Sequence, residues 1–210
     1  MSIKNILLLL CILLIVSCKR DTGQHTEMRI QRWLDYYDLT LNDFEEVGNQ
    51  TIPYQLQQEY SAQELEIFVP FFVYNPDSTK AIDLDSYHLV LEKLENGKLY
   101  ASGRDVDMEA GLIDFEKSIR TRLLFCGPAC LFEEGSFPQE GIITITGFAD
   151  DGMGYTPVIW EIDPITLSLT LSASSQIFEA QEIRYTQDVR LDNVIFARDP
   201  DDFDHLDVPL

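Results

Sequence analysis

The apolar and polar positions divide the chain into a short helical start and a long β-rich body. From Ile30 onward, apolar residues recur every three or four positions, which predicts one or two amphipathic helices ending near Gly48. We expect this apolar stripe to pack into the core, with a ligand surface as the alternative. After Gln50, β-branched and aromatic residues gather between turn residues. In residues 165–171, Ile and Leu alternate strictly with Thr and Ser, as in a strand with one buried face.

Several further segments share this β-rich character. Pro70 lies inside the first of them and favours an edge or a bulge there. The candidate strands are residues 65–74, 87–94, 117–125, 142–148, 157–162, 165–171 and 189–197. The body is too short for the four or more four-stranded blades of a propeller. We therefore expect a mainly β fold: an antiparallel sandwich or a curved meander with an N-terminal helical segment.

The first eighteen residues follow a different pattern. Lys4 precedes an unbroken apolar run over residues 6–16, and Ser17 and Cys18 come next. Eleven helical residues at about 1.5 Å each span roughly 16 Å, which is about half of the ~30 Å hydrocarbon core of a bilayer. The run therefore predicts a cleaved signal peptide rather than a transmembrane helix.

Residues 1–21 resemble the lipobox signal of bacterial lipoproteins, with Ile15 where leucine is usual. The resemblance implies that residues 1–17 are removed and that acyl chains, palmitate among them, are attached to Cys18. It also implies that Cys18 holds the mature chain on a lipid bilayer of the cell envelope, more often the outer membrane than the inner one. The alternative is an uncleaved apolar N-terminus in which Cys18 is incidental.

The expected organisation has four parts: a signal peptide (1–17), a lipidated tether (18–26), a single β-rich domain with an N-terminal helix (27–198) and an acidic tail (199–210). With 45% hydrophobic residues, the chain can bury a substantial core. Its net charge of −21 offers no basic stripe for a phosphate backbone, so we expect no nucleic-acid binding. A protein partner would be basic, and an uncharged ligand is the other possibility.

The segment from Cys126 to Cys130 is the sharpest local feature of the body. In an oxidising compartment, two thiols this close in sequence are expected to close a small disulfide loop. Free thiols or metal ligands, and redox catalysis, are the alternatives. The segment resembles the Cys-Gly-Pro-Cys motif of thioredoxins, but Ala129 is inserted and no helical pattern follows.

Other chemistry has little support in the sequence. The three histidines are scattered without metal-ligand spacing, and we expect no metal and no cofactor. A carboxylate pair for hydrolysis is conceivable in so acidic a chain. No Gly-x-Ser-x-Gly elbow or phosphate-binding glycine loop is present. The histidines are His25, His88 and His205, and the candidate carboxylates are Asp105, Asp107, Glu109, Glu133 and Glu134.

Taken together, the sequence predicts an envelope-anchored, non-catalytic lipoprotein that binds or scaffolds an unknown ligand. Two alternatives stay open. One is an enzyme of the envelope, either a thiol-disulfide oxidoreductase or a hydrolase. The other is a membrane-held immunity or inhibitor protein.

Overall fold

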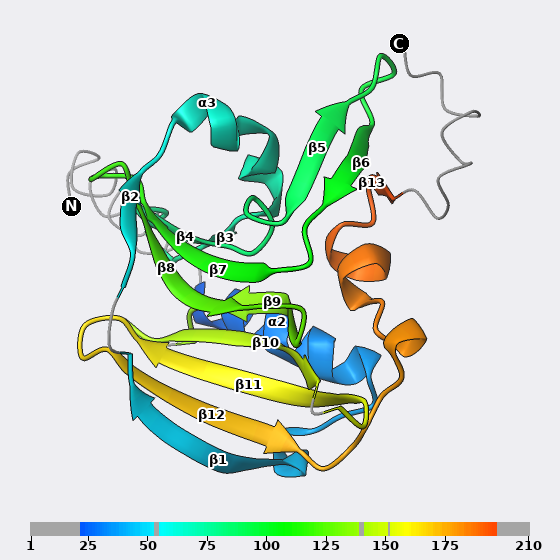
Figure 1. Ribbon diagram of the computed structural model, residues 1–210. Helices are drawn as coiled ribbons and strands as arrows, with labels where there is room; N and C mark the ends of the chain where they lie inside the picture. The colour runs from blue at the N-terminus through cyan, green and yellow to red at the C-terminus, as the bar shows by residue number, and fades with distance from the viewer. Residues whose placement is uncertain (1–21, 53–54, 139–140, 151, 197–210) are drawn as a thin grey trace, which may run out of the picture.

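The computed structural model describes residues 22–52, 55–138, 141–150 and 152–196 (Figure 1). The lipidation candidate Cys18 and the acidic tail 199–210 lie outside the described residues. Among the residues that the structure describes, no helix is long and apolar enough to cross a membrane.

The described residues form three sheets, and every strand pair in them is antiparallel except β13 with β6. The first sheet has the order β1 (Phe44–Thr51), β12 (Ser168–Ser174), β11 (Tyr155–Asp163), β10 (Ile143–Asp150) and β9 (Cys130–Ser136). The second has the order β2 (Gln57–Glu59), β8 (Ile119–Cys126), β7 (Met108–Asp114), β4 (Lys80–Asp83) and β3 (Val73–Tyr74). The third joins the hairpin β5 (Leu89–Lys93) and β6 (Leu99–Arg104) to β13 (Val194–Phe196), which runs parallel to β6.

The helical segments lie outside the sheets, and α2 is the longest of them. Helix α2 (Thr22–Tyr36) packs against β9, and α3 (Ala62–Leu65) continues into a 3₁₀ helix (Glu66–Phe71). Two further 3₁₀ turns are Leu41–Asp43 and Ala180–Glu182, and residues Thr186–Arg190 form a π-helical turn.

The first and second sheets pack face to face around the main core (Figure 1). Alternation along each strand decides which side chains enter it. In β10, Ile143 and Ile145 point inward, and in β11 Trp160 does the same. They meet Ile82 and Leu123 from the second sheet. The expected mainly β, sandwich-like fold with an N-terminal helix is thus confirmed.

Two smaller cores cover the outer faces of this sandwich. On the second sheet, α3 and the following 3₁₀ helix bury Leu65, Phe68 and Phe71 against the third sheet. On the first sheet, α2 and the turn that follows it bury Trp33 and Tyr37 in the other small core. That cluster continues through Phe148 of β10 and Tyr185 of the C-terminal segment.

Four local predictions were wrong. Residues 65–74 are mostly helical rather than extended, because their aromatic side chains are buried by lying across the second sheet and Pro70 has no N–H for a sheet ladder. Residues 44–51 form strand β1 instead of helix, because β12 offers them a pairing edge. Residues 165–167, expected to begin a strand, form the turn before β12, and Ile165 is 83% exposed because it lies beyond the sheet. Helix α2 begins at Thr22, within the segment 18–26 that was expected to form a tether.

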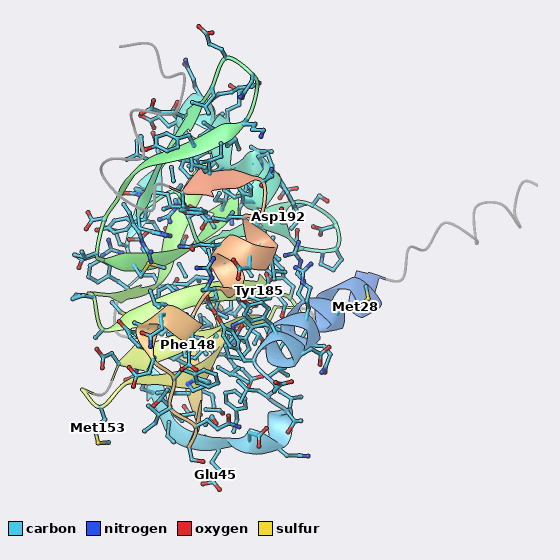
Figure 2. All side chains as sticks on the ribbon, turned by 90° about the vertical axis from the view of Figure 1, so that its right-hand side faces the viewer. Met28, Glu45, Phe148, Met153, Tyr185 and Asp192 are labelled. Carbon is cyan, nitrogen blue, oxygen red and sulfur yellow. A yellow bond between two sulfur atoms is a disulfide. The ribbon has the colours of Figure 1, made fainter. Side chains whose placement is uncertain are left out.

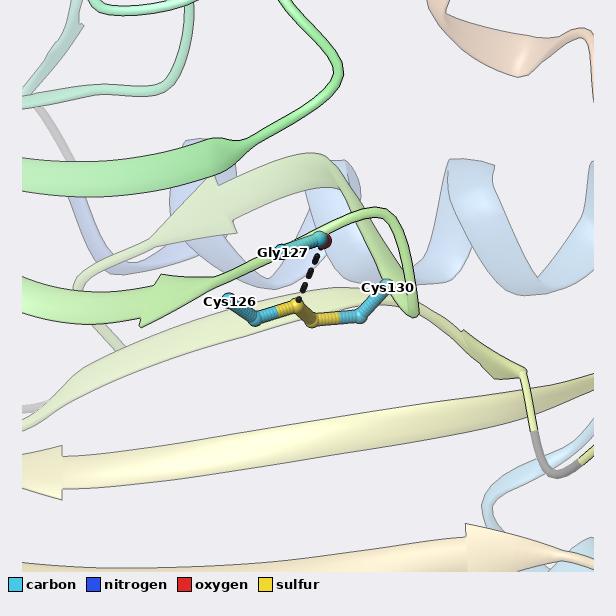
Figure 3. Close-up of a disulfide and its surroundings, with 3 residues drawn as sticks. All are labelled: Cys126, Gly127 and Cys130. Carbon is cyan, nitrogen blue, oxygen red and sulfur yellow. Dashed lines mark hydrogen bonds between the residues drawn. A yellow bond between two sulfur atoms is a disulfide. The ribbon is translucent and has the colours of Figure 1, made fainter.

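Cys126 and Cys130 form a disulfide, as the sequence predicts (Figure 3). The bond closes the turn between β8 and β9, where the chain passes from the second sheet to the first. It therefore holds together the corner of the sandwich, and in this state neither sulfur is a free thiol.

Candidate functional site

Two neighbouring carboxylates of β9, Glu133 and Glu134, are buried beneath α2. In a regular strand, neighbouring side chains point to opposite faces of the sheet. The pairing of β9 with β10 shifts register here, because Thr146 faces Glu134 whereas Gly147 faces Phe132. This bulge lets both carboxylates contact the same helix. The sequence lists the two acids as hydrolysis candidates, and the structure brings them together.

Glu133 is 3% exposed and accepts hydrogen bonds from two aromatic residues, Trp33 of α2 and Tyr37 directly after this helix. Trp33 Nε1 donates at 3.0 Å and the Tyr37 hydroxyl at 2.8 Å. The backbone N–H and hydroxyl of Thr186 lie at 3.4 Å from the other carboxylate oxygen. Glu133 thereby joins α2 to the C-terminal segment.

Glu134 is fully buried and accepts from two arginines of α2. Arg29 Nη1 lies 3.0 Å from one carboxylate oxygen and Arg32 Nη2 lies 3.2 Å from the other. The Tyr185 hydroxyl donates to Glu134 at 2.7 Å and accepts from Arg32 Nε at 3.0 Å. The arginines remain partly exposed, so solvent screens the ion pairs and their main role is to fix the position of the helix.

Glu133 also gives the fold a pH dependence. Burial raises the pKa of its carboxyl, and the hydrogen bonds from Trp33 and Tyr37 offset only part of that shift. The pKa of Glu133 is therefore higher in the folded protein than in the unfolded chain. Preferential protonation of the folded state stabilises the protein fully below the unfolded-state pKa, and this stabilisation is lost as pH rises through the folded-state pKa. We expect the free energy of unfolding to decrease with rising pH more steeply in the wild type than in Glu133→Gln.

Urea unfolding of both proteins from mildly acidic to mildly basic pH measures this difference. Glu161→Gln removes an exposed carboxylate of the same sheet and controls for the loss of one charge. If the free energy of unfolding changed with pH in the same way in wild type and Glu133→Gln, the raised pKa of Glu133 would be contradicted.

The helix held by these carboxylates forms one wall of a groove of about 680 Å³ on the outer face of the first sheet. Met28, Ile30 and Leu34 of α2 line this groove, which we call the α2 groove. Figure 2 shows Met28 near the N-terminal end of α2. Leu41 and Phe44 continue the apolar wall beyond the helix. Met28 and Leu41 are 53% and 63% exposed, so this apolar surface is accessible to a ligand.

The floor of the α2 groove is rich in hydroxyl groups. Ser136, Thr144 and Ser172 line it together with Ile159, and Glu161 is a carboxylate on the same surface. These residues occupy the outward positions of strands whose inward positions fill the sandwich core. The alternation that builds the core therefore also places the hydroxyls.

Two hydroxyls on this face have no hydrogen-bond partner among the described residues. They are Ser136 Oγ, which lines the groove, and Thr146 Oγ1, which lies on the neighbouring strand under α2. Both residues are fully buried. Buried polar groups nearly always have a partner, so an unpaired hydroxyl at the floor of a groove indicates a place where a ligand can donate or accept.

No family model, no curated protein and no solved structure matches this chain.

The other residues that the sequence singles out lie apart from the α2 groove. Glu109 is buried on β7, where it pairs with Arg120 and Arg122. His88 is buried, and burial lowers its pKa to about 4. Asp105 and Asp107 lie in the connection between β6 and β7. The side chains of His25 and His205 lie outside the described residues. Within the described part of the chain, no cluster of three or more His, Cys, Asp or Glu side chains is placed to hold a metal ion.

The sequence indicated part of the groove wall, as the ligand-surface alternative for the apolar stripe that begins at Ile30, but it did not indicate the hydroxyl floor. Thr144 and Ser172 belong to segments predicted as strands or their immediate extensions, and strict alternation would have placed their side chains on one face. That signal does not show that α2 stands beside this face, because the contact joins segments about a hundred residues apart.

Proposed function

We propose that this chain is a lipid-anchored, non-catalytic binding module of the bacterial envelope, and that the α2 groove holds its ligand. The ligand class is an uncharged amphiphile with an aliphatic body and a hydrogen-bonding head. The observation that carries the proposal is the pairing of an exposed aliphatic wall with a hydroxyl floor that includes the unpartnered Ser136.

The composition of the groove supports this ligand class. Aliphatic side chains such as Met28 and Leu41 favour burial of an apolar body. Ser136, Thr144 and Ser172 can exchange hydrogen bonds with a neutral head group. Glu161 and the net charge of −21 disfavour an anionic head.

The carboxylates near the groove support a binding role. Glu133 and Glu134 both face α2 and accept hydrogen bonds from side chains of that helix. Their contacts fix the wall of the groove in position. A prearranged wall reduces the entropy cost of binding a ligand.

A fluorescence experiment tests the groove. The uncharged probe N-phenyl-1-naphthylamine is expected to bind saturably, and 1-decanol is expected to displace it more strongly than decanoate does. Leu41→Ser should weaken probe binding about fivefold, because part of a leucine contact is lost. Ser136→Ala should weaken displacement by decanol and leave probe binding unchanged.

Val106→Ser is the matched control, because Val106 is 70% exposed and lies outside the groove. Equal losses in Leu41→Ser and Val106→Ser would place the probe elsewhere. Stronger displacement by decanoate than by decanol would contradict an uncharged ligand.

The anchor has its own test. Full-length wild-type protein expressed in a bacterium is expected to incorporate a palmitate analogue and to sediment with membranes. Cys18→Ser should lose both properties, because the thiol that accepts the lipid is absent. Cys11→Ser, in the apolar run of the signal, is the control and should retain both. Membrane association of Cys18→Ser without label would indicate an uncleaved N-terminus instead.

A further inference from the structure

A second cavity of about 390 Å³ lies on the outer face of the second sheet, between β2 and α3. Arg120 of β8 lines this cavity, which we call the Arg120 cavity. Glu59 of β2 and Glu64 of α3 lie on its walls. The other polar residues of its lining are Gln58, Tyr60, Ser86 and Tyr87. None of these residues lines the α2 groove, which lies on the other sheet.

The guanidinium of Arg120 is held firmly in the floor. The residue is 4% exposed, and its Nε donates to Asp83 at 2.8 Å. Its Nη1 pairs with Glu109. The guanidinium also lies directly over Gly111 of β7, since a Cβ at Gly111 would be 2.5 Å from Arg120 Cζ. Packing against bare backbone therefore fixes the orientation of the arginine.

One nitrogen of this guanidinium remains unused. Arg120 Nη2 is buried and has no hydrogen-bond partner among the described residues. A buried donor left without an acceptor is costly, and more so when it carries charge. An acceptor supplied by a ligand in the cavity would remove that cost.

The charges around the cavity define what the ligand must carry. In the floor, Arg120 and Arg122 balance Asp83 and Glu109. The free nitrogen thus offers a strong donor without excess positive charge. Glu59 and Glu64 are exposed and attract cations. A ligand that pairs with both the free nitrogen of Arg120 and the two glutamates is a small molecule that carries an anionic hydrogen-bond acceptor and ammonium groups.

We infer that the Arg120 cavity binds a small diamino acid, with its carboxylate on Arg120 Nη2 and its ammonium groups toward Glu59 and Glu64. The contact with Arg120 is a charge-assisted hydrogen bond, and the ammonium contacts set the charge preference. This site is independent of the α2 groove and of the lipid anchor.

Titration calorimetry with L-lysine as the probe tests the inference. Lysine is expected to bind saturably at millimolar or lower concentrations. Cadaverine lacks the carboxylate and norleucine lacks the side-chain ammonium, and each should bind at least about tenfold more weakly. This series tests the Arg120 contact without altering Arg120, whose replacement would also disturb Asp83 and Glu109.

Two variants locate the site. Glu64→Gln should weaken lysine binding severalfold and should weaken norleucine binding less, because norleucine has one ammonium group fewer. Glu95→Gln removes one carboxylate from the β5–β6 turn, outside the cavity, and should change neither. Cadaverine binding as tight as lysine binding would overturn the role of Arg120. Absence of saturable lysine binding, or equal losses in both variants, would overturn the site, whatever the outcome for the α2 groove.

Discussion

Replacing Gly147 with alanine is expected to destabilise the fold by about 3 kcal/mol or more. Gly147 lies on β10 beside the β9 bulge, and an added Cβ would stand 1.9 Å from the carbonyl oxygen of Leu131. That oxygen belongs to the backbone of the adjacent strand, so no side-chain rotation can relieve the clash. The sheet would have to separate where Glu133 and Glu134 hold α2. Urea unfolding followed by tryptophan fluorescence measures the loss.

Gly48→Ala provides the matched control for this variant. Gly48 also lies beside a register shift in the first sheet, on β1, but nothing stands within 4 Å of its added Cβ. Its substitution is expected to change stability by less than about 0.5 kcal/mol. Similar unfolding midpoints for Gly147→Ala and wild type would show that the bulge is not as tight as described.

Replacing Arg190 with methionine is expected to cost about 3–5 kcal/mol of stability. Arg190 ends the π-helical turn and reaches Asp85 with both terminal nitrogens, at 2.5 Å and 2.8 Å. Both side chains are less than 5% exposed. Removing the arginine leaves the Asp85 carboxylate buried without its cation, and desolvation of that charge is then uncompensated. Thermal and urea unfolding give the change.

Two further variants separate the ion pair from general damage to the C-terminal turn. Arg184→Met removes an exposed cation of the same segment and should have a much smaller effect. The double variant Asp85→Asn, Arg190→Met should recover part of the loss, because the unpaired charge is gone. A double variant that is less stable than Arg190→Met would contradict the buried-charge explanation.

The strands of the first sheet were partly predictable from β-branched and aromatic residues that stand between turn residues. Segments 142–148 and 157–162 were correctly predicted as strands β10 and β11, whereas only residues 168–171 of the alternating segment 165–171 belong to β12. Residues 44–51 and 65–74 were assigned wrongly for a common reason. Both are amphipathic segments whose conformation depends on a partner far away in sequence: β12 for the first, and the outer face of the second sheet for the other.

The candidate site was less predictable than the fold. The sequence drew attention to Glu133 and Glu134, yet it gave them no partner, because Trp33, Arg29 and Arg32 lie about a hundred residues earlier. A bulge also defeated the rule of alternation at that point. The sequence also could not show that Arg120 is buried with one nitrogen unpaired, because its partners Asp83 and Glu109 lie on other strands.

The sequence by itself determined the properties that depend on neighbouring residues: the mainly β character, the closeness of Cys126 to Cys130 and the lipobox pattern that ends at Cys18. Only the tertiary structure decided which faces meet. It set α2 against β9 and left the α2 groove beside it, and it laid Arg120 across Gly111. The contact of α2 with β9 joins segments about a hundred residues apart, and the energy of these contacts comes from burial, which no local period in the sequence can specify.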